Sequence, residues 1–456
     1  MNDAPSDSPL PTPLQKAARF FNFQQLNTNW RAEWLAGVTT FVTMAYILVV
    51  NPLILSNAIF INEPLDLFNE LAIATAISAA IATAIMGFYA KLPFALAPGM
   101  GLNAYFTYTV VITIGVDWRA ALGAVFIEGL IFIALTLSGV RSQIIALIPN
   151  GLKHATTAGI GLFIAYIALK NAGLIVADDA TLTGLGNLQA SSSIIALIGI
   201  ALTAALVTRR ISGALLWGML VTALLAWITG AASWPQGFFE IPKVPTSLVG
   251  QAFSGVGALW RVNFLDAASV IFVLLFVDLF DTVGTLAGLG ARAGYITEEG
   301  SFPGSQKAMM ADAVGTTAGA VMGTSTVTTY IESAAGMAAG GRSGFTAIVV
   351  ALMFCVSILF IPLFASIPSF ATAPALLIVG SLMMAGVRNI KWDDPAEAIA
   401  CFLTIIVMPL SFSIAEGIAI GLIAYPILKL CQGERKTLSW GMWVLAALFL
   451  VRYALS

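Results

Sequence analysis

Charged residues are scarce in this 456-residue chain: only 10% of it is Asp, Glu, Lys or Arg, whereas 59% is hydrophobic. The mean hydropathy is +0.92, and one soluble core has no room for so much apolar surface. The formal net charge of −2 leaves no basic excess for nucleic acid. The composition indicates a polytopic membrane protein that does not bind nucleic acid.

Histidine and cysteine are also rare. The chain has one histidine, His154, and three cysteines, of which Cys355 and Cys401 fall inside apolar runs and Cys431 follows one. This set cannot build a disulfide framework or a CxxC metal site. We expect neither a metal nor an organic cofactor.

Two common sequence signals are missing as well. The N-terminus is polar and Pro-rich, so we expect no cleaved signal peptide. The Gly-rich string GLGARAG (288–294) ends an apolar run without a preceding strand, and no GxxxxGK[ST] motif occurs. An ATP-driven pump is therefore not indicated.

Apolar runs of about 20 residues, the length that crosses ~30 Å of hydrocarbon as a helix, fill most of the sequence. Fourteen spans are expected, near 35–56, 71–90, 95–115, 119–138, 154–174, 192–208, 213–231, 266–289, 308–323, 325–340, 344–365, 373–387, 396–412 and 415–430. A last apolar run, 438–455, is either an interfacial helix or a further span, and hydropathy leaves this open.

The basic residues test this count. If the N-terminus is cytoplasmic and the fourteen spans alternate, sixteen of the 21 Lys and Arg residues fall inside. Arg119, Lys170, Lys243 and Arg261 fall outside, and Arg452 is unassigned. This bias agrees with the positive-inside rule and predicts a cytoplasmic N-terminus.

The two sets of seven segments resemble distorted copies, and an odd number of spans makes such copies inverted in the membrane. The third segment of each set, ALAPGMGLNAYFTY (95–108) and AVMGTSTVTTYIES (320–333), contains Gly, Pro or hydroxyl residues instead of a steady apolar helix. These residues weaken a helix and favour extended backbone. We therefore predict an all-α membrane protein with short extended stretches in segments 3 and 10, meeting at a binding site.

Three carboxylates mark that site. Asp278 and Asp281 lie three residues apart in the eighth segment, hence on one helical face, and Glu332 lies in the tenth. A carboxylate inside a bilayer is costly and is normally retained at a proton or substrate site. A carboxyl that gains and loses a proton can couple a substrate to the proton gradient. The trio predicts a proton-coupled transporter, although one buried acid can also merely tie helices together.

The remaining acids and the histidine carry less weight. For Glu128, isolated in the fourth segment, an interhelical hydrogen bond and a functional role are equally good interpretations. Asp266, Asp312 and Glu416 lie near segment ends, where solvated carboxylates are expected. His154 is interpreted as a residue at the membrane boundary.

Four strings carry a family resemblance: FVTMAYILVVNP (41–52), APGMGLNAYF (97–106), FVDLFDTVGT (276–285) and GTSTVTTYIES (323–333). Together they resemble the AzgA-like purine permeases, a branch of the nucleobase:cation symporter-2 superfamily. The resemblance covers nearly the whole membrane region. It implies import of adenine, guanine and hypoxanthine with protons as the coupling ion, and a homodimer.

The resemblance also implies fourteen spans in two inverted repeats of seven, divided into two domains. The core would comprise 35–138 and 266–365, and the gate 154–231 and 373–430. A cytoplasmic tail, 1–34, would precede them, and a tail with a possible interfacial helix, 431–456, would follow. Short loops and the absence of a targeting segment suit a bacterial inner membrane.

By motif position, the resemblance assigns substrate contacts to Asn103, Asp278 and Glu332 and proton binding to Asp281. Aromatic and hydroxyl side chains beside this set are candidates to line the pocket, namely Tyr105, Phe280, Thr282, Thr328 and Ser333. Ordinary packing remains the better interpretation for each aromatic residue taken singly.

Other classes fit less well. Uracil and xanthine permeases resemble each other in a Glu–His type eighth segment, whereas this chain has Asp and Thr there. A sulfate-permease type anion transporter would share the fold, but three acids disfavour an anion. An intramembrane enzyme needs a nucleophile and a base within reach, and His154 is at the membrane edge. A paired-aspartate protease should carry its aspartates on different helices.

Overall fold

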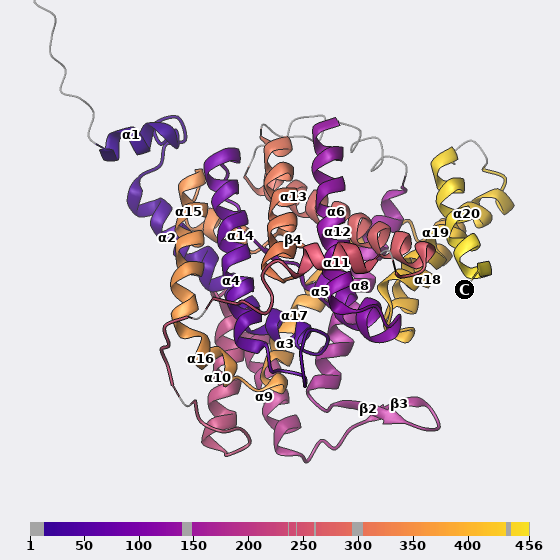
Figure 1. The fold of residues 1–456 in the computed structure, drawn as a ribbon, viewed down its shortest axis with the longest axis horizontal. Coiled ribbons are helices and arrows are strands. Elements are labelled where there is room, and N and C mark those ends of the chain that lie inside the picture. Colours follow the sequence, from indigo (N-terminus) through magenta and orange to yellow (C-terminus); the bar gives the residue numbers. More distant parts are fainter. Residues whose placement is uncertain are drawn as a thin grey trace, which may run out of the picture.

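The structure is a computed structural model and describes residues 13–138, 148–235, 237–242, 244–259, 261–293, 304–434 and 439–455. The expected tail residues 1–12 and the basic residues Arg141, Lys243, Arg435 and Lys436 lie outside these ranges. Helices dominate the described chain (Figure 1). Nine of the helices described are long and apolar enough to cross a membrane, and three shorter apolar helices accompany them.

Helices or strand–helix units occupy each of the fourteen expected ranges. The first half contains α2 (Trp30–Met44), α3 (Ile47–Leu55), α4 (Phe68–Ile85), η1 (Met86–Ala90), β1 (Leu96–Pro98), α5 (Met100–Ala104), η2 (Tyr105–Thr113), α6 (Trp118–Ser138), α8 (Asn150–Asn171), α9 (Ser191–Thr208) and α10 (Ala214–Ile228). The second half contains α12 (Phe264–Arg292), α13 (Ser305–Met322), β4 (Val327–Thr329), α14 (Ser333–Ala338), α15 (Gly344–Ser357), η3 (Ile358–Phe360), α16 (Ile361–Ala365), η4 (Ser369–Thr372), α17 (Ala373–Met383), η5 (Met384–Asn389), α18 (Pro395–Leu410) and α19 (Ile414–Cys431). The arrangement as two inverted sets of seven stays a prediction.

Both expected extended stretches are present, and they pair with each other. β1 and β4 are antiparallel, with Ala97 opposite Thr328. Gly323, with φ 94°, ends α13 in a left-handed conformation that favours glycine and so releases the chain into the strand. Short helices α5 and α14 follow the two strands, as expected for segments that begin extended and end helical.

Backbone groups around the strand pair are satisfied by side chains as well as by the sheet. The amide of Leu96 donates to Thr83 Oγ1, and the amide of Ala95 donates to Ser333 Oγ, both at 2.9 Å. Non-helical backbone at this depth is tolerated only where such partners exist. The hydroxyl residues of the broken segments therefore keep the two strands in place.

The helices pack in two groups. In one, α13 packs against α6 and α4, and α15 packs against α2 and α4. In the other, α8 packs against α17, α18 and α19, and α9 packs against α10 and α17. The α8–α17 contact is close because Gly161 faces Gly380: a Cβ on Gly161 would lie 2.6 Å from the Gly380 carbonyl oxygen.

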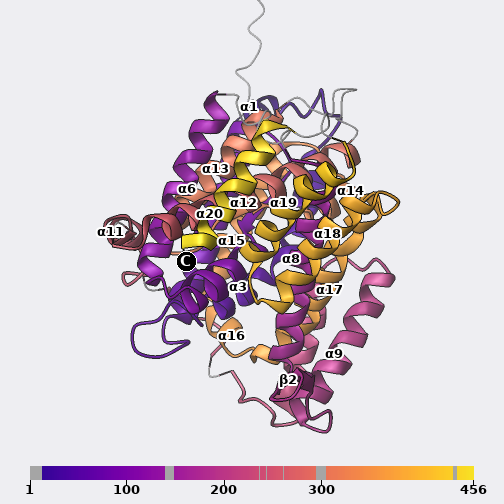
Figure 2. The ribbon, with the colours of Figure 1, turned by 90° about the vertical axis from the view of Figure 1, so that its right-hand side faces the viewer.

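Smaller elements surround these groups. A hairpin of β2 (Ile175–Asp178) and β3 (Leu182–Leu185) projects from the end of α8, and α1 (Pro13–Phe20) lies at the opposite end of the molecule (Figure 1). α11 (Gln251–Leu259) packs across α6. The last apolar run forms α20 (Trp440–Leu455), which packs against α19 (Figure 2).

Candidate functional site

The broken run at 324–329 connects five separate helices. Each hydroxyl in it bonds to a polar side chain on a different helix: Thr324 accepts from Asn51 on α3 at 3.0 Å, Ser325 donates to Asn103 on α5, Thr326 donates to Glu128 on α6 at 3.3 Å, Thr328 bonds Thr282 on α12 at 3.1 Å, and Thr329 donates to Asp312 on α13 at 2.9 Å. The run is buried throughout. It gathers polar side chains of five helices around β4.

Asp281 and Glu332 lie on one side of this run. Glu332 directly precedes α14, and its Oε1 accepts from the Tyr46 hydroxyl at 2.8 Å. Asp281 is hydrogen-bonded to Thr328 and lies close enough to Glu332 for their charges to interact. Both carboxylates are partly exposed, whereas Tyr46 is fully buried. They are the two carboxylates beside this run that are not fully buried.

Asp278 lies deeper, in a cluster of three fully buried carboxyl groups. It is hydrogen-bonded to Glu128, and Asp312 lies near enough to Glu128 to repel it. A hydrogen bond between two carboxyl groups requires that one of them hold a proton. Asp278 and Asp281, three residues apart on α12, therefore lie in different surroundings; that they serve one site stays a prediction.

The interpretation of Asp312 as a solvated acid near a segment end is wrong. Its side chain is 0% exposed and accepts hydrogen bonds from Thr282 at 2.7 Å and from Thr329 at 2.9 Å. The sequence placed Asp312 close to the end of an apolar run, but β4 packs beside that turn of α13. Glu128, left open between two roles, belongs to the same cluster.

Asn103 is placed by the short helix that follows β1. Its Oδ1 accepts from Ser325, and its amide nitrogen Nδ2 is buried and meets no acceptor within the described chain. A buried donor without a partner costs about 1–3 kcal/mol. A donor of this kind is suited to a ligand carrying an acceptor.

Aromatic rings pack near the carboxylates. Phe280 packs edge-on against Phe276 with ring centroids 4.5 Å apart, and Tyr105 is buried within η2. Thr282 and Thr328 are buried between the two groups of acids. The hydroxyl of Ser333 instead accepts from the backbone of Ala95, which gives it a role in holding the strands.

Sequence reasoning missed Tyr46 and Ser325. Tyr46 follows the end of α2, where the helix is interrupted before α3, and this turns its hydroxyl toward Glu332. The polar tip of a tyrosine inside the apolar string MAYILVVNP was the available signal. Ser325 stood within the predicted broken run, but its bond to Asn103 depends on the pairing of two distant segments.

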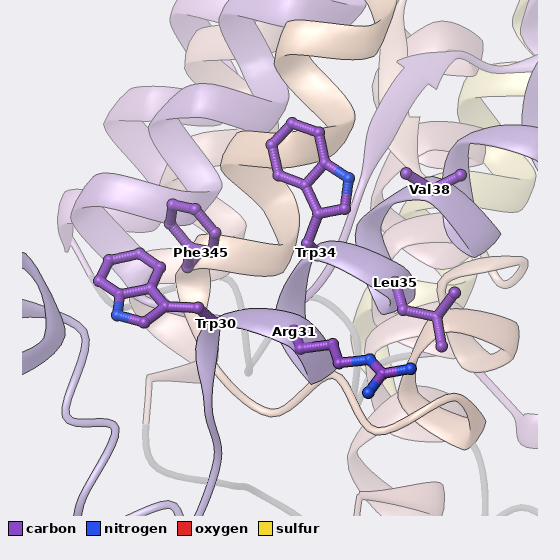
Figure 3. A pocket seen from close by; sticks show the side chains of 6 residues that line it. All are labelled: Trp30, Arg31, Trp34, Leu35, Val38 and Phe345. Carbon is purple, nitrogen blue, oxygen red and sulfur yellow. The ribbon is translucent and has the colours of Figure 1, made fainter. Parts of the chain in front are cut away.

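A pocket of about 620 Å³, lined mostly by aromatic and aliphatic side chains, lies on the outer surface. Figure 3 shows its lining on α2 and at the start of α15, where Trp30, Trp34 and Phe345 surround it together with Arg31. Leu35 and Val38 complete the lining, which contains no carboxylate. It is separate from the acids around β4.

Known proteins resemble this chain over most of its length. Residues 31–420 match the Xan_ur_permease model, described as Permease family. The guanine/hypoxanthine permease PbuO of Bacillus subtilis is 43% identical over 437 residues, covering 95% of this chain and 99% of the relative. The adenine permease AdeQ of Escherichia coli is 40% identical over 438 residues, covering 96% of each chain.

A solved structure shares the fold. The transmembrane domain of a cyanobacterium bicarbonate transporter, BicA, aligns with a TM-score of 0.60 at 16% identity, over 85% of this chain and 97% of that one. At this identity the likeness concerns the fold alone. The family match and the relatives show that this chain is a multi-pass membrane transporter and not an enzyme: it belongs to the permease family of xanthine, uracil and purine nucleobase transporters.

Proposed function

We propose that this protein imports purine nucleobases together with protons. The observation that carries the proposal is the convergence of Asn103, Asp281 and Glu332 on one polar run, with a free amide donor and two partly exposed carboxylates. Relatives at 40–43% identity are named adenine and guanine/hypoxanthine permeases. An anion would meet acids here, which disfavours bicarbonate or sulfate despite the shared fold.

The chemistry of a purine suits these side chains. A carboxylate accepts two hydrogens from the N1–H and amino group of guanine, and an asparagine amide both donates and accepts. We assign substrate contacts to Asn103, Glu332 and Asp278. Tyr105, Phe280, Thr282, Thr328 and Ser333 surround this set, and a flat base next to aromatic rings gains stacking energy.

Proton coupling follows from the charge of the substrate. A purine is neutral, so membrane voltage alone cannot concentrate it. A carboxyl that takes up a proton outside and releases it inside supplies the driving force. Asp281 is our choice, because it is partly exposed and within reach of the substrate ligands.

Alternating access would come from one group of helices moving against the other. We propose fourteen spans in two inverted repeats of seven, with a core of 35–138 and 266–365 and a gate of 154–231 and 373–430. The separate packing of α8, α17, α18 and α19 supports such a division. We further propose a homodimer in the plasma membrane with a cytoplasmic N-terminus.

The test is uptake of labelled hypoxanthine and adenine into proteoliposomes of the purified protein, with and without an inward proton gradient. Guanine, uracil and sulfate serve as competitors. Gradient-driven accumulation that guanine blocks and uracil and sulfate do not is the expected result. Accumulation of uracil or sulfate instead would agree with the fold and overturn the purine assignment.

A further inference from the structure

An unbroken line of hydrogen bonds runs from the partly exposed Asp281 to the buried Asp312. Asp281 is bonded to the hydroxyl of Thr328, and that hydroxyl lies 3.1 Å from the hydroxyl of Thr282. Thr282 Oγ1 lies 2.7 Å from Asp312 Oδ2. Thr282 and Asp312 are 0% exposed and Thr328 is 2% exposed, so bulk water does not enter the line at these three groups.

The hydrogen count of this line allows two arrangements. A threonine hydroxyl has one hydrogen to donate and accepts on its lone pairs, whereas an ionised carboxylate only accepts. If Asp281 holds the proton, Asp281 donates to Thr328, Thr328 to Thr282, and Thr282 to ionised Asp312. If Asp312 holds it, every bond reverses. One proton is thus shared between two carboxyl groups through two hydroxyls.

Passage from one arrangement to the other is balanced. The O–H bond of Asp281 breaks as Thr328 gains that proton, Thr328 gives its own proton to Thr282, and Thr282 gives its own to Asp312. Each hydroxyl receives one proton and loses one. The net change is one proton moved to Asp312 and one negative charge moved to Asp281, with no other reactant.

The surroundings of Asp312 fit a place where a proton is stored. Thr329 donates to its second oxygen at 2.9 Å, and the neighbouring titratable groups are acids, Glu128 on α6 and Asp278 on α12. Among the described residues, every ion pair lies elsewhere in the molecule. A proton on Asp312 therefore reduces repulsion within a cluster of buried acids.

We propose that Thr328 and Thr282 relay the coupling proton between Asp281 and Asp312. The inference rests on the proposed symport of purine and proton. It adds where the proton is held during transport. The relay lets Asp281, to which the proposed function gives the coupling proton, ionise while that proton stays inside the protein on Asp312.

Thr282→Val tests the relay, because valine keeps the shape of threonine and removes the hydroxyl. Thr282→Ser restores a hydroxyl. Thr316→Val is the matched control: Thr316 is equally buried on the neighbouring α13, and its hydroxyl bonds the Val327 carbonyl at 2.8 Å, outside the line. Two rates are measured in proteoliposomes, acidification of the lumen on addition of hypoxanthine and exchange of labelled for unlabelled hypoxanthine.

We expect Thr282→Val to lower the ratio of the acidification rate to the exchange rate by at least about tenfold, and Thr282→Ser and Thr316→Val to keep the wild-type ratio. Wild-type acidification in Thr282→Val would overturn the relay. So would an equal loss of both rates, or a serine variant as impaired as the valine one. If the wild type exchanges hypoxanthine without acidifying the lumen, the proposed symport itself fails, and this outcome is separate from failure of the relay.

Discussion

Tyr46 donates its hydroxyl hydrogen to Glu332 Oε1 over 2.8 Å and so joins the turn between α2 and α3 to the start of α14. The two residues are 286 positions apart in sequence. Because Tyr46 is fully buried, its hydroxyl holds this oxygen of Glu332 in a fixed place.

Tyr46→Phe should weaken purine binding. Loss of a hydrogen bond to a carboxylate costs about 1.5 kcal/mol, which raises Kd about tenfold. Calorimetric titration of the purified protein with hypoxanthine measures this. Tyr166→Phe is the control, because Tyr166 packs edge-on against Phe412 and its hydroxyl makes no hydrogen bond within the described chain. Equal Kd values for Tyr46→Phe and wild type would contradict the role given to this contact.

Asn103→Asp should abolish tight purine binding, because it replaces the free amide donor by an acceptor. The expected loss is at least about 1.4 kcal/mol, or tenfold in Kd. Asn51→Ala is the comparison: the Asn51 amide already donates to Thr75 at 2.7 Å and Thr324 at 3.0 Å, so its loss should lower the unfolding temperature and leave Kd unchanged. Calorimetric titration with hypoxanthine measures the Kd of both variants. Unchanged binding by Asn103→Asp would show that Asn103 is not part of the binding site.

Asp281→Asn should lose accumulation more than binding. The amide cannot carry the coupling proton, but it keeps the size of the side chain. Uptake of labelled hypoxanthine with an inward proton gradient should fall to the level reached without one, while exchange continues. Asp266→Asn, near the start of the same helix, should accumulate like wild type. Accumulation against a gradient by Asp281→Asn would show that the proton is carried elsewhere.

Asp394→Asn should destabilise the protein and leave the side chains of the candidate site unchanged. Asp394 pairs with Lys429, which is 4% exposed and also contacts Glu434 at 2.8 Å. Leaving that ammonium with one partner should cost on the order of 2–3 kcal/mol, below the value for a wholly unpaired buried charge. Thermal unfolding in detergent measures it, with exposed Asp393→Asn as the control. Equal unfolding temperatures for the two variants would refute the estimate.

The same ion pair predicts a pH dependence. Partial burial raises the pKa of Asp394. The hydrogen bond and the positive charge of Lys429 lower this pKa by a larger amount, so the net pKa lies below its ordinary value. A depressed folded-state pKa means that the pair stabilises the protein above about pH 4, and this stabilisation is lost as the pH falls through the folded pKa. Unfolding temperatures of wild type and Asp394→Asn should therefore converge below about pH 4.

The fold was predictable wherever a local pattern decides it. Long apolar runs such as 118–138 and 150–171 form helices because lipid leaves no other partner for their backbone. The extended stretches were predictable because Gly99, Gly323 and the hydroxyl run weaken helix at those positions. The pairing of β1 with β4 joins residues more than two hundred positions apart, and no local pattern specifies it.

The candidate site was predictable in part. Asp278 and Asp281 stood out because charge is rare in apolar runs, and their spacing placed them on one helical face. Asp312 did not stand out, because distance along the sequence from the end of a run does not measure depth once β4 packs beside α13. Hydrogen bonds such as that between Thr282 and Thr328 depend on tertiary packing alone.

The most direct test of proton coupling is the pH of the lumen in wild-type proteoliposomes. Unlabelled hypoxanthine is added outside, with no pH gradient and with potassium and valinomycin to clamp the voltage. A symporter must acidify the lumen as the base enters, and guanine added beforehand on both sides should reduce the signal. Entry of hypoxanthine at an unchanged lumenal pH would contradict the account and leave a permease that works without protons.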